Sequence, residues 1–519
     1  MTTTAEPHRS RFPFHAMAAI VCLALIVMPW LKYAGLRTLF FDTGQYITLF
    51  NISRNVDALV PALSTHTQAF LPVYATLLQG LPTPYGMLFV QSLACILGFH
   101  ALKSAIADRD LTPLVFAVYF GALSVWFTAL NEFHFEHLIF GLYFLFIRAL
   151  FSPSPYRDLM LVGSAALICL VKEVYALSAL MMGVMLLFHG RHRAGALIIL
   201  LSGSYFLLAT QVLIPAFTEG QDVGELWQSA FGHLGDTPLD MAKTILLNPG
   251  ALLTSGLISP RKLLFVAVMA APFAYTLWRA PSAWLPALPS FGVMFLSNNE
   301  NHAYLGHHYT VMVTAVAMGA MALSLKGLDL SARKRLLTIS AALSGLMLVL
   351  FGPAPLASRL FWAGHAWGFQ ASAYLPDARS REIARLIETH VPADGTLVVS
   401  VQNSINHTRI ADRPVVLPYP LGVAEPGRVL SSVATRVFPA VSGSPNAALA
   451  PKGLALADIV VVDLKRPLSL KDAGCRWTAD KICDDPAFLA RFERTLSPLA
   501  TGFDRLASHD GFAIYRRRP

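Results

Sequence analysis

Charged residues are scarce in this chain, which has 519 residues of which only 14% are Asp, Glu, Lys or Arg. In soluble domains roughly a quarter of the residues are charged. Hydrophobic residues make up 55% of the chain and gather in long runs. This composition excludes an ordinary soluble domain and predicts a polytopic membrane protein. The net charge of +9 comes from short basic clusters between apolar runs, where membrane topology is set, so no nucleic-acid partner is expected.

Several motifs are missing as well. The sequence has no phosphate-binding loop of the GxxxxGK[ST] kind, which argues against an ATP-driven pump. It has no Gly-x-Ser-x-Gly elbow and no persuasive Ser-His-Asp set. Cysteines number only five, and two of them, Cys475 and Cys483, lie close together near the C-terminus. Their spacing permits a disulfide if that region is extracytoplasmic.

About eleven apolar runs between residues 15 and 353 predict an all-α polytopic membrane bundle. With the N-terminus in the cytoplasm, every cytoplasmic loop is basic, which satisfies the positive-inside rule. An odd number of spans then places the C-terminus outside. We expect a transmembrane domain over residues 1–355, with long outside loops at 37–85 and 215–262.

Residues 356–519 are expected to form a small extracytoplasmic α/β domain, because helical and strand-like patterns alternate there. The expected helices are Pro376–His390 and Pro486–Leu496, and the expected strands are Leu397–Val401, Val415–Leu417, Ile459–Val462 and Phe512–Tyr515.

Polar residues cluster in the loops that this topology places on the outer face. They are Asp42 and His66 in the first outside loop, Asn131–His137, Lys172 with Glu173, Asn298–His302, and His307 with His308 and Tyr309. Ionisable groups are costly at membrane depth and usually line a polar cavity. The sequence therefore predicts that these separate clusters converge on one site.

Simpler interpretations remain open. Glu132 and His134 could simply solvate a tight loop. Asp42 follows the first span directly and could cap the next helix. Lys172 and Glu173 could pair with each other at a structural break between two helices. His307 and His308 could lie at the membrane interface without a bound partner.

A divalent metal is a further possibility. His134 and His137 are three residues apart, so on a helix both imidazoles would share a face with Glu132 nearby. The predicted metal ligands are therefore Glu132, His134 and His137. The stricter His-Glu-x-x-His pattern of zinc proteases is absent.

These motifs, in this order, resemble a family of bacterial and archaeal predicted membrane proteins catalogued as domain of unknown function two thousand and seventy-nine. The resemblance covers roughly residues 40–515. The family typically shows Phe-Asp-x-Gly, Asp-Phe-His-Pro-Glu, Lys-Glu-Asp and Tyr-His-Tyr. In this chain Glu132 replaces the Asp of Asp-Phe-His-Pro-Glu, and Phe135 replaces its Pro. Val174 replaces the Asp of Lys-Glu-Asp, and His307 replaces the first Tyr of Tyr-His-Tyr.

That family is similar in layout to the glycosyltransferase C superfamily, whose members use polyprenyl-phosphate sugar donors. By this resemblance Asp42 would be the general base on the acceptor, or a metal ligand. A lipid-linked sugar donor, an acceptor of unknown identity and membrane lipids would be the partners. The resemblance also implies that the protein lies in the inner (plasma) membrane of a bacterium.

We therefore expect a membrane glycosyltransferase in which Asp42 acts as base. His66, His134, Lys172, Glu173, His307 and His308 would bind the substrate and its phosphate. Two alternatives are a transporter or lipid flippase, in which buried charges mark a path, and a non-enzymatic envelope assembly protein that binds partners through residues 356–519.

Overall fold

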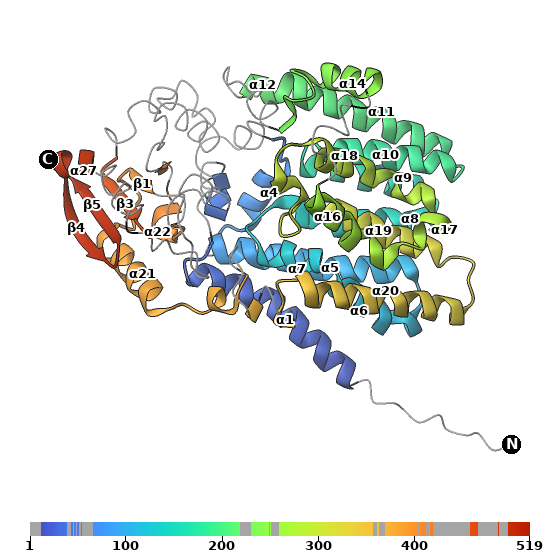
Figure 1. Ribbon diagram of the computed structural model, residues 1–519, viewed down its shortest axis with the longest axis horizontal. Coiled ribbons are helices and arrows are strands. Elements are labelled where there is room, and N and C mark those ends of the chain that lie inside the picture. The colour runs from blue at the N-terminus through green and yellow to red at the C-terminus, as the bar shows by residue number, and fades with distance from the viewer. Residues whose placement is uncertain are drawn as a thin grey trace.

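The computed structural model describes most of the chain. The described residues are 12–38, 43, 44, 46, 47, 49, 50, 53, 66–81, 83–217, 230–248, 250, 259–356, 361, 362, 369–401, 405–411, 413, 416–418, 457–465, 486 and 497–519. Figure 1 shows a bundle of helices and, beside it, a small sheet near the C-terminus. Asp42, Cys475, Cys483 and most of the predicted helix Pro486–Leu496 lie outside the described residues.

Four helices of the described chain are long and apolar enough to cross a membrane. They lie within α1 (Phe12–Ala34), α5 (Thr83–Ile106), the continuous run from α11 (His192–Leu208) through η4 (Ala209–Leu213) into α12 (Ile214–Phe217), and α20 (Leu330–Phe351). A fifth candidate is a bent pair, Arg109–Gly121 with Leu123–Leu130, whose two parts meet at 58°. This pair contains α6 (Thr112–Gly121) and α7 (Leu123–Leu130).

The predicted count of about eleven spans is not shown, because the other apolar helices are short. Among them are α8 (Leu138–Leu150), α9 (Arg157–Val171), α10 (Tyr175–Phe188) and α19 (Thr310–Ser324). A helix of 15 residues is about 22 Å long, less than the roughly 30 Å of a bilayer core. Two of the predicted apolar runs, 263–279 and 283–297, are interrupted by prolines. They fold into short pieces: α16 (Pro260–Ala270), η5 (Ala271–Phe273), α17 (Thr276–Arg279), η6 (Pro281–Ala287) and α18 (Leu288–Leu296).

The bundle is organised around α19, which is buried along almost its whole length and packs against α8. Close helix contacts depend on small residues. A Cβ atom at Gly195 of α11 would lie 2.8 Å from the carbonyl oxygen of Gly183 on α10. Small residues at such crossings let two backbones approach closely, as is common between helices in membranes.

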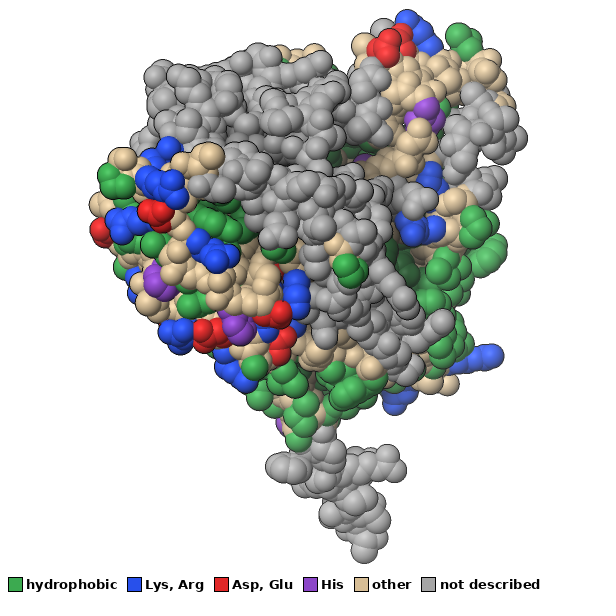
Figure 2. Space-filling model, turned by 60° about the vertical axis from the view of Figure 1, so that its left-hand side comes forward, with side chains coloured by type: hydrophobic (Ala, Val, Ile, Leu, Met, Phe, Trp, Pro, Cys, Tyr) green, Lys and Arg blue, Asp and Glu red, His purple; other side chains and the backbone are tan. Residues whose placement is uncertain are grey.

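Large apolar side chains cover much of the outer surface of the long helices. Ile20 and Leu23 of α1, and Leu200 and Leu207 of α11, are each at least 60% exposed. Figure 2 shows hydrophobic side chains over the bundle and mixed charged side chains over the C-terminal sheet. The two surfaces suit a lipid environment and an aqueous one respectively.

The remaining short helices of the described bundle lie between its longer helices in the sequence or follow them. They are α4 (Phe70–Leu77), η2 (Arg109–Leu111), η3 (Phe135–His137), α14 (Pro238–Leu247), η7 (Glu300–Ala303) and η9 (Ala371–Tyr374).

The C-terminal sheet has five strands in the order β2-β1-β3-β5-β4. The strands are β1 (Val399–Val401), β2 (Val416–Pro418), β3 (Ile459–Asp463), β4 (Phe503–His509) and β5 (Phe512–Arg517). Strand β1 pairs in parallel with β2 and β3, whereas β5 runs antiparallel to β3 and β4. Asp510 and Gly511 both have positive φ in the tight turn between β4 and β5, as a two-residue hairpin turn requires.

Helices α21 (Ala378–His390), α22 (Thr408–Ala411) and α27 (Ser497–Gly502) accompany the sheet. The predicted helix at 376–390 and the strands near 397, 415, 459 and 512 are present. Strand β4 was not predicted, because its exposed polar residues Asp504 and Arg505 hide its alternation. The structure therefore has a small mixed sheet with helices at this end of the chain.

Asp377 joins the bundle to the C-terminal part. One carboxylate oxygen accepts a hydrogen bond from the Ser380 backbone N–H at 2.6 Å, which caps the start of α21. The other oxygen lies 2.8 Å from Arg37 Nη2, just beyond the end of α1. Asn406 Nδ2 adds a hydrogen bond of 3.1 Å to Thr38 Oγ1.

Arg379→Ala is expected to destabilise the C-terminal part strongly. The guanidinium of Arg379 contacts both oxygens of Asp463 at 3.0 and 2.7 Å, and the Asp463 side chain is only 2% exposed. Removing one partner of a buried pair leaves an uncompensated charge and costs about 3–5 kcal/mol. Protease resistance of residues 378–519 over a denaturant series measures the loss. Arg385→Ala, which breaks an exposed pair with Glu382, is the control; equal resistance of the two variants would contradict the prediction.

Candidate functional site

The predicted polar residues lie at the ends of helices. His66 precedes α4, the loop 131–137 joins α7 to α8, Lys172 and Glu173 separate α9 from α10, and His308 precedes α19. The structure brings these loops together into one set of contacts, which we call the Glu136 cluster: His66, His134, Glu136, Lys172, Glu173 and His308.

Glu136 is at the centre of this cluster. Its Oε1 lies 3.5 Å from Lys172 Nζ and 3.6 Å from His308 Nε2, and its Oε2 lies 4.0 Å from His134 Nδ1. The imidazoles of His134 and His308 face each other with centroids 4.1 Å apart. The Glu136 side chain is 2% exposed, so its charge depends on these neighbours rather than on water.

The charges of the cluster follow from its surroundings. Burial alone would raise the pKa of Glu136, but the nearby Lys172 and His134 lower it by more than burial raises it. The pKa of Glu136 therefore lies below its usual range. Burial lowers the pKa of Lys172, yet Glu136 raises it, and the net shift is upward. Burial and then the nearby His134 and Lys172 push the pKa of His308 well below its usual value. The cluster therefore combines a carboxylate, an ammonium and a neutral imidazole.

A second ion pair borders the first. Glu173 Oε1 lies 2.7 Å from His66 Nδ1, and Glu173 Oε2 accepts a hydrogen bond of 3.0 Å from the Thr67 backbone N–H. Lys172 and Glu173 are thus not paired only with each other, as the simpler interpretation of the sequence proposed. They point to two different partners and hold two loops against the turn between α9 and α10.

Glu132 lies in a separate network. Its Oε1 is 3.6 Å from Lys32 Nζ, which also donates to the Leu130 carbonyl at 3.1 Å. Its Oε2 accepts a hydrogen bond of 2.6 Å from Thr43, whose hydroxyl in turn accepts from the Phe133 N–H at 3.0 Å. Thr43, which follows Asp42 in the sequence, is therefore tied to the 131–137 loop through Glu132 and the Phe133 N–H.

The predicted metal set of Glu132, His134 and His137 is not brought together. His137 Nδ1 lies 2.5 Å from the His134 carbonyl oxygen and its Nε2 lies 2.9 Å from the Tyr74 hydroxyl. The reason is local backbone geometry. Residues 135–137 form a 3₁₀ turn rather than an α-helix, which changes the direction of side chains three residues apart. His134 meets Glu136 and His308 instead.

One predicted residue, His307, is placed less centrally. The ring contacts of His307 are with Tyr304 and Tyr309, at centroid distances of 5.0 and 6.3 Å. Its neighbour His308 is the one that faces Glu136. Sequence reasoning did not select Glu136 as a site residue, although its position in the same polar loop was a usable signal.

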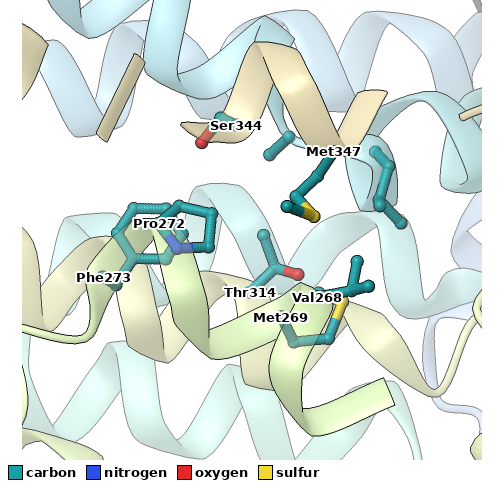
Figure 3. Close-up of a pocket in the computed structure, with 9 residues that line it drawn as sticks. Val268, Met269, Pro272, Phe273, Thr314, Ser344 and Met347 are labelled. Carbon is teal, nitrogen blue, oxygen red and sulfur yellow. The ribbon is translucent and has the colours of Figure 1, made fainter. Parts of the chain in front are cut away.

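An apolar pocket lies apart from the Glu136 cluster. Figure 3 shows it between Pro272 and Phe273 of η5, Thr314 of α19, and Ser344 and Met347 of α20. Ala122 and Leu123, at the bend between α6 and α7, also line it. The buried hydroxyls of Thr314 and Ser344 make no hydrogen bond among the described residues. Among the predicted site residues that the structure describes, none lines this pocket.

A family model described as predicted membrane protein (DUF2079) matches residues 21–389. The chain belongs to this family. The match covers the whole Glu136 cluster and ends within α21, before the sheet, so it is shorter than the predicted extent of 40–515. No curated protein matches the chain. Family membership and the apolar helices together make this a membrane protein.

Glu173→Ala is expected to lower the free energy of unfolding by about 1–3 kcal/mol, because the buried Thr67 N–H would lose its acceptor. Glu173→Gln should cost less, since its amide oxygen can still accept that hydrogen bond. Thermal unfolding of the purified protein in detergent provides the measurement. The exposed Asp158→Ala is the control, and a Glu173→Ala protein as stable as this control would show that the contact has no energetic role.

Proposed function

We propose that this protein is an integral-membrane glycosyltransferase that takes its sugar from a polyprenyl-phosphate donor. The observation that carries the proposal is the Glu136 cluster itself. Loops from four separate parts of the bundle place an ammonium and several imidazoles around one largely buried position at the helix ends. Buried ionisable groups that perturb one another in this way are typical of functional sites.

The cationic groups suit a phosphate leaving group. Lys172 has a 13% exposed side chain beside Glu136, and His66, at 36%, is more open to solvent. An ammonium and an imidazole N–H placed near a departing phosphate stabilise the charge that develops on it. Glu173 would hold His66 in position through the contact between Glu173 Oε1 and His66 Nδ1. His134 and His308 would complete the phosphate side of the site, with His307 next to them.

The transfer itself needs a base. The acceptor hydroxyl oxygen would attack the anomeric carbon of the sugar while the bond from that carbon to the phosphate oxygen breaks. The proton of the hydroxyl would pass to the Asp42 carboxylate, and the electron pair of the broken bond would leave with the phosphate. The position of Thr43, the next residue in the sequence, supports this role, because the Thr43 hydroxyl bonds to Glu132 in the loop that supplies His134 and Glu136.

We also propose how the chain is arranged in the membrane. The shorter apolar helices would complete about eleven membrane passages by packing inside the bundle. The N-terminus would lie in the cytoplasm of a bacterium, the protein in its inner membrane, and residues 356–519 outside. The boundary between residues 355 and 356 would then separate the membrane domain from an extracytoplasmic domain. The lipid-linked donor would enter from the surrounding bilayer.

Asp42→Asn and Lys172→Ala are each expected to slow sugar transfer at least 100-fold, through loss of the base and of phosphate stabilisation respectively. The assay uses full-length protein in lipid nanodiscs with polyprenyl phosphates that carry radiolabelled hexose or pentose. Release of polyprenyl phosphate and appearance of the sugar in acceptor or water are both counted. Lys326→Ala, which removes a lysine stacked on Phe151 away from the cluster, is the matched control.

Three results would contradict this scheme. Normal transfer by Asp42→Asn would remove the base assignment. Substrate flux in proteoliposomes without any covalent product would favour the transporter or flippase. Loss of a binding partner on deletion of residues 356–519, with no donor turnover by the intact chain, would favour an assembly protein.

A further inference from the structure

We propose that His134, Glu136 and His308 form a binding site for a divalent transition-metal ion. Each residue offers one ligand atom, and these atoms all lie within 4.8 Å of one another. The three residues come from two loops that are distant in the sequence, so only the fold assembles them. The inference does not depend on sugar transfer, because metal binding is measured without any substrate.

The spacing of the ligand atoms fits a shared ion better than direct bonds. Glu136 Oε1 lies 3.6 Å from His308 Nε2, and Glu136 Oε2 lies 4.0 Å from His134 Nδ1. These separations are too long for hydrogen bonds. Two ligands that each lie about 2.1 Å from a tetrahedral ion are roughly 3.4 Å apart. A modest inward movement of the side chains would therefore place all three around one ion.

Unsatisfied polar atoms provide an independent observation. Glu136 Oε2 and both ring nitrogens of His308 are buried and make no hydrogen bond within the described part of the chain. A buried polar atom without a hydrogen bond costs about 1–3 kcal/mol, and more when it is charged. A metal ion would satisfy Glu136 and one nitrogen of each histidine together.

The ligand types narrow the choice of ion. Two imidazoles and one carboxylate suit Zn²⁺, Mn²⁺ or Fe²⁺, whereas Mg²⁺ and Ca²⁺ prefer oxygen ligands throughout. Three protein ligands also leave a position for a water molecule or a substrate oxygen, which is the pattern of catalytic rather than structural sites.

Lys172 sharpens the prediction, because its ammonium lies 3.5 Å from Glu136 Oε1 and would compete with a metal for the same carboxylate. A bound cation would release Lys172 toward an anion at the open position. If the cluster were only an ion pair, removing Lys172 would leave Glu136 unpaired whatever metal is present. If it is a metal site, a divalent cation should replace the missing charge.

Lys172→Met is therefore the central test. The variant should lose thermal stability in metal-free buffer, and Zn²⁺ or Mn²⁺ should restore its melting temperature to near that of the unmutated protein. It should also bind the ion at least as tightly as the unmutated protein in isothermal titration. The double variant Lys172→Met with Glu136→Gln should show no rescue. All measurements use the full chain in detergent.

Ligand removal completes the test. Glu136→Gln and, separately, His308→Gln should weaken metal binding about 100-fold or more. Glu132→Gln and His302→Ala, which remove a nearby carboxylate and a nearby imidazole outside the proposed set, should leave it unchanged. Should Glu136→Gln fold poorly, His308→Gln tests the same site without changing the charged pair.

Two outcomes would overturn the site. One is the absence of saturable binding of Zn²⁺, Mn²⁺ or Fe²⁺ to the unmutated protein, with no metal rescue of Lys172→Met. The other is loss of binding in Glu132→Gln while Glu136→Gln and His308→Gln bind normally, which would place the ion elsewhere.

Discussion

The polar face of this bundle depends on neutralising the charge of one buried carboxylate, that of Glu136. A charge with 2% exposure is stable only when cations or hydrogen-bond donors surround it. The compensating groups come from the turn between α9 and α10 and from the segment before α19. The need to neutralise Glu136 therefore ties together helix ends that are far apart in the sequence, and the same contacts create the candidate site.

The helices around the cluster are short for a related physical reason. Polar residues such as Lys172 and Glu173 interrupt apolar runs, and their backbone turns away from helical geometry at Lys172, which is extended. A continuous span could not present these side chains toward the bundle interior from its end. A helix that ends early at a polar residue is shorter, but it can direct that residue toward the bundle interior. For the same reason the sequence contains more apolar runs than helices long enough to cross a bilayer among the described residues.

Much of the site was predictable from the sequence, and the remainder depended on local geometry. Basic loops and apolar runs indicated that His66, His134, Lys172 and His308 share one face, and the structure brings them together. The structure does not bring the imidazole of His137 to that of His134, because a helical spacing was assumed for these two residues, where the chain forms a 3₁₀ turn. The bend between α6 and α7 and the strand β4 were also missed, since neither has a distinctive apolar pattern.

Asp377 has a mechanical consequence. A single carboxylate both begins α21 and holds Arg37 at the exit from α1. This carboxylate therefore holds the leading helix of the C-terminal part against the end of α1, beside the contact between Asn406 and Thr38. A displacement of α21 would therefore be transmitted to the residue just beyond α1, although Arg37 and Asp377 are 340 positions apart in the sequence.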